Sequence, residues 1–311
     1  MLARALAVLL AFVSLAATPR NAQAYVRELT NSGLPVAWRY PCVTMQVYPG
    51  TAPMELTTDE YFAASARAAA VWSYPALAGT DIRLTMVKAA SDSAEVGNDK
   101  KNVIVFRQDT WCRQPTPIDD AGAPQPYCYS ASVLAVTSVF KSGKTGEILD
   151  TDIEFNAVNY SWGDLVAQPD RAGATTADFQ NALTHELGHV LGLDHNCYTQ
   201  ADNHTRMNDN TGAPEVDCYG NPTLPQAVAD ATMFPSVQLG DTLRRDLSPD
   251  DQLGVCEIYP HLHDVCPARP SDGGCTVLTT PGPKASQTAI LWTTAGLLIA
   301  ALAFLRGRLK V

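Results

Sequence analysis

The eleven residues from His185 to His195, His-Glu-Leu-Gly-His-Val-Leu-Gly-Leu-Asp-His, constrain the fold of this 311-residue chain more than any other segment. On a helix, His185 and His189 stand one turn apart and project from the same face. Gly192 lets the chain leave that helix sharply, because glycine readily adopts the backbone conformations that end helices. His195 can then return toward the other two histidines. The segment therefore predicts a helix, a glycine turn and three converging imidazoles.

Three converging imidazoles are a ligand set for zinc, and they leave a fourth position for water, as catalytic zinc sites do. Glu186, next to His185, is placed to take a proton from that water. No histidine precedes His185, and three of the six histidines fall in this short span. Incidental histidines on an amphipathic helix explain such a pattern poorly. The sequence predicts one catalytic zinc with Glu186 as the general base.

The pattern resembles that of the metzincin metallopeptidases, and within them the matrixins. Residues 231–235, Ala-Thr-Met-Phe-Pro, resemble the methionine turn of that family. The resemblance implies that Met233 lies beneath the metal, and that Phe234 and Pro235 wall the pocket after the cleaved bond. Residues 247–260 resemble the matrixin C-terminal helix, which Ser248 can cap. The likeness covers roughly residues 25–260 and is specific only over 184–260.

The resemblance implies an α+β fold. Its expected parts are a twisted, mostly parallel sheet with an antiparallel edge strand, an active-site helix and a C-terminal helix. The active-site helix could be capped by Thr175 or Thr176 and run to about Leu191. A first helix over 57–73 begins with a capping-box pattern. The segment 147–156 falls where matrixins place their substrate-binding edge strand.

This chain also departs from the matrixin pattern. The structural zinc of matrixins uses upstream histidines, and none precedes His185, so we expect no second zinc of that kind. No cysteine-switch sequence is present. Asn196 follows the third histidine where better-known subfamilies have Ser, Asp or Glu, and the segment between His195 and Met233 is unusually long.

The segment 147–156 alternates apolar residues with the acids Asp150, Asp152 and Glu154. Strict alternation predicts a strand with one buried and one solvent-facing side. The acids then line the solvent-exposed face of the strand. Alternatively, they belong to an edge strand or to a cluster of calcium ligands. Calcium is for this reason an additional candidate cofactor.

Both ends of the chain differ from its middle. Residues 1–24 have a basic start, a short apolar run and a small-residue cleavage pattern, which predicts a secretory signal peptide. Residues 261–287 are rich in proline, glycine and serine and predict a stalk. Residues 288–311 hold an apolar run followed by a basic tail, which predicts a transmembrane or sorting segment. We expect an exported, extracellular or cell-surface protein, with residues 25–260 as its catalytic domain; whether the C-terminal segment is retained stays open.

The formal net charge is −10, and none of the 32 acidic residues lies in the two end segments. An acidic middle of this kind argues against a nucleic-acid partner. We expect a protein or peptide substrate and a membrane contact through the C-terminal segment. The sequence leaves the oligomeric state open.

Eight cysteines lie between the end segments, and an even number in an exported chain predicts disulfides. Their spacing suggests local pairs but does not determine connectivity. The cysteines are Cys42, Cys112, Cys128, Cys197, Cys218, Cys256, Cys266 and Cys275. Local pairing joins Cys112 to Cys128, Cys197 to Cys218 and Cys266 to Cys275, which leaves Cys42 with Cys256.

The function expected from these features is a zinc-dependent endopeptidase that cleaves proteins outside the cytoplasm. The alternative is a catalytically inactive zinc-binding adhesion module on the same fold, and a third is a metal-dependent hydrolase of another bond. An intact Glu186 argues against the inactive module, because a structural zinc needs no base beside it. The sequence indicates neither the substrate specificity nor the route of activation.

Overall fold

The computed structural model describes residues 25–91, 94–113, 127–199, 206–219 and 224–260. The predicted signal peptide, stalk and C-terminal segment lie outside these ranges. Within them, no helix is long and apolar enough to cross a membrane.

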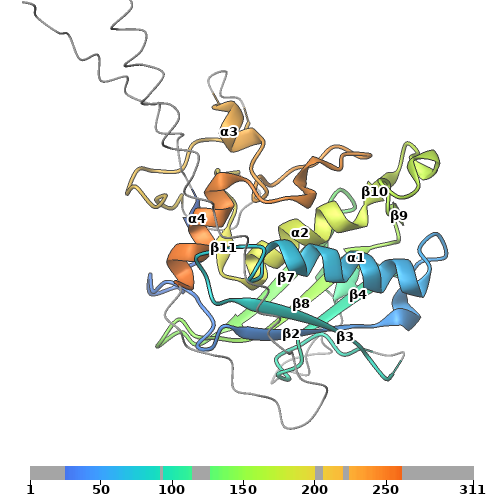
Figure 1. The fold of residues 1–311 in the computed structure, drawn as a ribbon, viewed down its shortest axis with the longest axis horizontal. Helices are drawn as coiled ribbons and strands as arrows, with labels where there is room; N and C mark the ends of the chain where they lie inside the picture. Colours follow the sequence, from blue (N-terminus) through green and yellow to red (C-terminus); the bar gives the residue numbers. More distant parts are fainter. Residues whose placement is uncertain (1–24, 92–93, 114–126, 200–205, 220–223, 261–311) are drawn as a thin grey trace, which may run out of the picture. The chain divides into compact units, whose positions relative to one another are not determined.

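The described residues combine short and long strands with a few helices (Figure 1). The strands are β1 (Val26–Arg27), β2 (Cys42–Val47), β3 (Arg83–Lys88), β4 (Val103–Arg107), β5 (Cys112–Arg113), β6 (Tyr127–Cys128), β7 (Ala135–Lys141), β8 (Ile148–Asn156), β9 (Ser161–Gly163), β10 (Thr176–Asp178) and β11 (Leu193–Asp194). The α-helices are α1 (Thr58–Val71), α2 (Phe179–Val190), α3 (Gln226–Ala229) and α4 (Pro249–Ile258), and short 3-10 turns span Pro49–Thr51, Pro169–Arg171 and Leu243–Arg245.

The central sheet has the strand order β3-β2-β4-β8-β7. Its first four strands run parallel, and β7 pairs antiparallel with β8 at one edge. Helices α1 and α2 lie on the same face of this sheet (Figure 1). The expected mostly parallel sheet with an antiparallel edge strand is confirmed, and its mixed content is compatible with an α+β fold.

The prediction that residues 147–156 form the edge strand is wrong. They form β8, which lies between β4 and β7, and the edge strand is β7. The reason is that β8 is buried on both faces: Ile153 and Phe155 are fully buried, and so are the acids that alternate with them. A strand covered on both faces belongs to the interior of a sheet.

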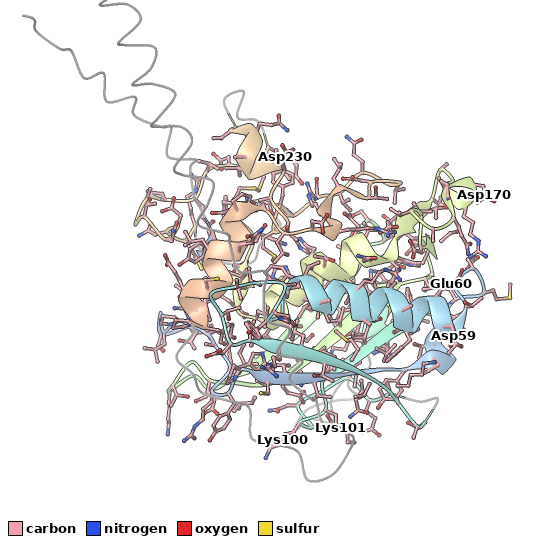
Figure 2. The ribbon with its side chains drawn as sticks, in the orientation of Figure 1. Asp59, Glu60, Lys100, Lys101, Asp170 and Asp230 are labelled. Carbon is pink, nitrogen blue, oxygen red and sulfur yellow. A yellow bond between two sulfur atoms is a disulfide. The ribbon has the colours of Figure 1, made fainter. Side chains whose placement is uncertain are left out.

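The prediction that one face of this strand is exposed to solvent is also wrong, since Asp150, Asp152 and Glu154 are all fully buried. The segment 94–102 and neighbouring side chains cover them, and Figure 2 shows Lys100 on the far side of the sheet from α1 and α2. Burial raises the pKa of Asp152 to about 7. The alternation therefore separates an apolar buried face from a polar buried face.

Backbone amides and one arginine satisfy these buried carboxylates. The amide of Gly97 donates to Asp152 over 2.7 Å, and the amide of Lys100 donates to Asp150 over 2.6 Å. Arg107 pairs with Glu154 over 2.6 Å. Among the described residues, this strand provides no group of three or more metal-ligating side chains, so the calcium interpretation gains no support here.

Local capping explains where the helices begin. Thr57 and Glu60 form the predicted capping box at the start of α1. Ser248 caps α4 as expected. The cap of α2 is Asp178 rather than Thr175 or Thr176, and its carboxylate accepts from the amide of Asn181 over 2.8 Å. The difference arises because residues 176–178 pair with β9 as a strand, which delays the helix.

The first described residues are tied to the C-terminal helix and to the segment that precedes His195. The amide of Tyr25 donates to the Asp250 carboxylate of α4 over 3.0 Å. Directly after it, β1 pairs antiparallel with β11. The start of the domain therefore helps to position the chain that leaves α2.

Two of the expected disulfides are present: Cys112–Cys128 and Cys197–Cys218. The expected Cys42–Cys256 pair is wrong, because Cys256 has a free thiol whereas Cys42 is disulfide-bonded. On α4, the Cys256 sulfur packs so closely against Gly79 that a Cβ at that glycine would lie 3.3 Å from it. The expected Cys266–Cys275 pair lies outside the described residues.

Candidate metal and catalytic site

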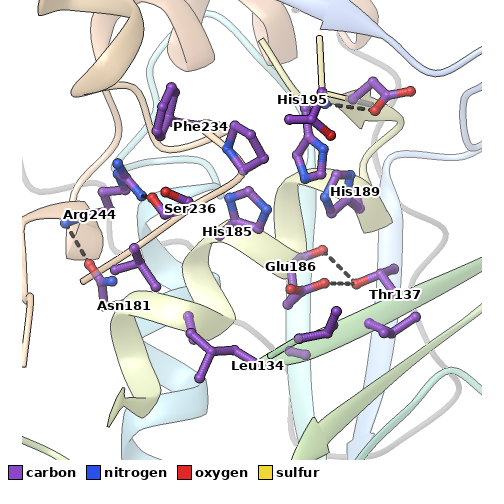
Figure 3. A pocket seen from close by; sticks show the side chains of 18 of the residues that line it. Leu134, Thr137, Asn181, His185, Glu186, His189, His195, Phe234, Ser236 and Arg244 are labelled. Atoms are coloured by element: carbon purple, nitrogen blue, oxygen red, sulfur yellow. Dashed lines mark hydrogen bonds between the residues drawn. The ribbon is translucent and has the colours of Figure 1, made fainter. Parts of the chain in front are cut away.

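Three histidine side chains converge at the C-terminal end of α2 (Figure 3). His185 and His189 come from α2, and His195 follows β11. One potential ligand atom from each lies within 4.8 Å of the other two. Among the described residues, they are the only group of three or more His, Cys, Asp or Glu side chains that could hold a metal ion. The geometry can thus hold one ion between three imidazoles.

Backbone carbonyls orient two of these rings. The Nδ1 of His185 lies 2.7 Å from the carbonyl oxygen of Thr232, and the Nδ1 of His189 lies 3.0 Å from that of Leu193. A carbonyl oxygen can only accept, so each Nδ1 must carry the proton and donate. The Nε2 lone pair of each ring is then available to a metal, and histidine ligands are usually oriented by a hydrogen bond of this kind.

The electrostatics of the group favour neutral rings. Burial, reinforced by the nearby His189 and His195, holds the pKa of His185 well below its usual range. A histidine must be deprotonated to ligate a metal. Three neutral nitrogen donors are a set that zinc accepts, so these residues fit that ion.

The turn that returns His195 depends on Gly192. Its φ is +84°, a left-handed conformation that residues with a side chain rarely adopt. A Cβ there would lie 2.6 Å from the carbonyl oxygen of Val36. The amide of Gly192 donates to the carbonyl of His189 over 2.9 Å, which closes the helix. Both the backbone conformation and the contact with Val36 therefore require glycine.

Met233 packs beneath the histidines at Gly188. Met233 is almost fully buried, and a Cβ at Gly188 would lie 2.2 Å from its sulfur. Gly188 therefore leaves room for the thioether on the helix between His185 and His189. Gly188 was not among the residues expected at the site, although a glycine inside a helix costs about 1 kcal/mol relative to alanine and so signals a close approach.

Asp251 of α4 holds the segment that contains Met233. Its carboxylate accepts from the amides of Thr232 and Met233, over 2.8 and 3.3 Å. Since the carbonyl of Thr232 in turn accepts from His185, the start of α4 is connected through Thr232 to a potential metal ligand. Burial raises the pKa of Asp251. The contacts join residues 19 and 18 positions apart, which no local sequence pattern reveals.

Glu186 lies on α2 beside the imidazoles and is largely buried. The hydroxyl of Thr137, on the edge strand β7, donates to Oε2 of Glu186 over 2.5 Å (Figure 3). Burial raises the pKa of Glu186 to about 7, although the Thr137 hydrogen bond and the nearby His195 oppose the rise. A carboxylate held in this way can accept a proton near neutral pH.

The histidines and Glu186 line a cleft of about 840 Å³. One wall consists of β7 and the residues before it, and the other is the segment 234–237 together with Arg244. In the described part of the sheet, β7 pairs with a strand on one side only. An edge of this kind can bind an extended peptide by adding a strand.

The structure brings together the residues that the sequence singled out at this site. His185, Glu186, His189, His195 and Pro235 all line the cleft. Gly192 forms the turn and Met233 lies beneath, while Thr137, Gly188, Asp251 and Arg244 join them without having been expected. Neither a scan of protein-family models nor a search of curated proteins finds a match to this chain.

Proposed function

We propose that this protein is a zinc-dependent endopeptidase, and that His185, His189 and His195 hold the metal. The observation that carries the proposal is the convergence of three imidazoles beside a buried carboxylate in an open cleft. Zinc in such a site supplies Lewis acidity, which lowers the pKa of its water and polarises the scissile carbonyl.

The protein's own residues perform the proton transfers. Glu186 accepts a proton from the attacking water and later delivers it to the nitrogen of the leaving amine. Thr137 holds one oxygen of that carboxylate, so the other oxygen is available to the water. The carbonyls of Thr232 and Leu193 keep the two helix-borne rings oriented throughout.

The substrate in this proposal is an extended peptide paired with β7. This replaces the expected role of residues 147–156, because in the described part of the sheet β7, and not β8, has an unpaired edge beside the cleft. Backbone pairing supplies binding energy without demanding particular side chains. Phe234 and Pro235 form the opposite wall, where the residue after the cleaved bond would lie.

Two observations favour a peptidase over the inactive zinc-binding module and over hydrolysis of another bond. Glu186 is buried and receives a directed hydrogen bond from Thr137, an arrangement of no use to a structural zinc. The edge of β7 that has no partner strand among the described residues suits a peptide backbone. With the predicted signal peptide and C-terminal segment, the enzyme would act outside the cytoplasm, held at least transiently at a membrane.

Metal removal is the first test of the proposal. Purified protein with one bound zinc should cleave an unfolded protein such as reduced casein. A zinc chelator should abolish cleavage, and added zinc should restore it, because the water is activated only on the metal. Cleavage products resolved by mass spectrometry provide the measurement. Full activity after complete zinc removal would refute the proposal, and zinc binding without any peptide cleavage would favour the inactive module.

Replacing Thr137 with valine should lower kcat by roughly tenfold to a hundredfold. This factor corresponds to the usual free energy of a hydrogen bond to a charged group. Valine keeps the shape of the side chain but removes the hydroxyl that holds Glu186. KM and zinc content should change little, because the backbone of β7 and the histidines are untouched. Steady-state kinetics on one peptide give both constants.

Thr137→Ser is the matched control, since serine retains a hydroxyl at the same carbon. It should recover most of the lost kcat. If the serine and valine variants lose the same activity, the hydroxyl does not position Glu186.

A further inference from the structure

Arg244 lines the same cleft as His185, and it forms no ion pair with a carboxylate of the described residues. Its Nη1 donates to the carbonyl of Ser236, and its Nη2 donates to that of Ala229 over 2.9 Å. Among the described residues, no Asp or Glu oxygen lies within ion-pair distance of it. Because a guanidinium has five N–H donors, three of them remain for another acceptor.

Its neighbour Arg245 shows the contrast. Arg245 pairs with Asp164 over 2.6 Å and also with Asp178, so its charge is neutralised within the fold. Asp241, Asp230 and Asp251 act on the charge of Arg244, but none of them forms an ion pair with it. One of them, Asp251, already accepts from Thr232 and Met233. Within the described residues, therefore, no ion pair neutralises the charge of Arg244.

The surroundings of Arg244 place this residue beside the helix that carries His185. Its backbone amide donates to the side-chain oxygen of Asn181 over 2.6 Å. Asn181 and His185 lie one turn apart on α2 and therefore on the same face. The guanidinium carbon lies 5.3 Å from the centre of the Phe234 ring, which forms part of the wall (Figure 3). The charge thus sits in a half-buried, partly apolar pocket beside a potential metal ligand.

We propose that Arg244 makes this endopeptidase prefer substrates with a carboxylate on the Phe234 side of the scissile bond. The inference rests on the proposed function. An arginine fork binds a carboxylate through two charge-assisted hydrogen bonds, and partial burial strengthens them. The expected substrates carry Asp or Glu next to the cleaved bond. In the arrangement proposed above, the Phe234 wall holds the residue on the C-terminal side of that bond, so the acid is expected there. A free C-terminal carboxylate presents the same chemistry.

The test compares kcat/KM for peptides that are cleaved at one internal bond and differ from each other at a single position. One position on the C-terminal side carries Glu in one peptide and Gln in the other, both with amidated C-termini. A third peptide carries Gln there and ends in a free carboxylate one residue later. A corresponding pair varies the residue before the bond. We expect Glu to be preferred over Gln by roughly tenfold to a hundredfold, with the preference falling as salt rises.

Arg244→Met should remove the preference, because methionine fills similar space without charge. Arg244→Lys should keep part of it, since the charge remains but the fork is lost. The ratio of two substrates on one enzyme is insensitive to how much of each variant folds. Arg83→Met is the matched control. Arg83 begins β3, at the opposite edge of the sheet from β7, and its guanidinium carbon lies 5.6 Å from the centre of the Tyr74 ring, so its loss should leave the ratio unchanged.

The outcomes separate the two proposals. If no peptide is cleaved in a zinc-dependent way, the proposed function fails. If peptides are cleaved but neither Glu nor a free C-terminal carboxylate is preferred over Gln on either side of the bond, or if Arg244→Met keeps the preference, the inference about Arg244 is overturned. A preference only for the free C-terminal carboxylate would support Arg244 as the anion site and would assign the enzyme to removing short C-terminal fragments.

Discussion

Replacing Glu186 with glutamine is expected to lower kcat by about 10²–10⁴-fold, the usual contribution of a general base, while zinc stays bound. Glutamine has nearly the same shape, and its amide oxygen can still accept from Thr137. It cannot take the proton of the attacking water, however. The three imidazoles are unchanged, so metal content should be close to one per chain. Initial rates and elemental analysis of the same sample give the two measurements.

An exposed carboxylate provides the control for this experiment. Glu55→Gln removes the same charge at an exposed position, which is not part of the cleft, and should leave kcat unchanged. If Glu186→Gln retains full activity with zinc bound, the proposed mechanism is wrong. If that variant loses both zinc and activity, Glu186 supports the metal site rather than the proton transfer.

Replacing Gly192 with alanine is expected to destabilise the fold and the metal site together. An L-residue at a φ of +84° carries about 1–2 kcal/mol of strain. Its Cβ would also lie 2.6 Å from the Val36 carbonyl, which is backbone and cannot simply rotate away. Overpacking of this kind costs a further 1–3 kcal/mol or so. Because His195 follows three residues later, the shift should also weaken zinc binding.

Gly212→Ala separates strain from contact. Gly212 has a φ of +83° and no atom within 4 Å of a built Cβ, so alanine there meets the strain alone. In urea unfolding, Gly212→Ala should lose less free energy of unfolding than Gly192→Ala. The zinc affinity of Gly212→Ala, measured by chelator competition, should match that of the unchanged protein. Equal effects of the two substitutions would show that Val36 imposes no constraint on the turn.

Much of the candidate site was predictable because its parts are close in sequence. His185 and His189 share a helical face through their spacing alone, and Gly192 ends that helix through its backbone freedom. Met233 was predicted only through a resemblance, and the structure gives a physical reason for its position in the contact with Gly188.

The errors have a common origin in packing partners that are distant in sequence. The alternation of apolar and polar residues in 147–156 correctly predicted a strand, but it did not predict which strands lie beside it. The same alternation occurs whether the polar face of a strand is exposed to solvent or buried. The amides of Gly97 and Lys100 bury Asp152 and Asp150, and they come from a loop about fifty residues earlier. The spacing of the cysteines likewise did not indicate that the Cys256 sulfur packs against Gly79 as a free thiol.

The sequence by itself determined the helix, the turn and the three imidazoles with their neighbouring carboxylate, because backbone geometry relates residues within one or two helical turns. Only the tertiary structure decided which strand lies at the edge and which hydroxyl holds Glu186. It also decided that Arg244 lines the cleft without a carboxylate partner among the described residues. Those features depend on contacts between segments tens of residues apart, such as Thr137 with Glu186 and Asn181 with Arg244. Such contacts follow from the packing of the whole domain, which no local pattern records.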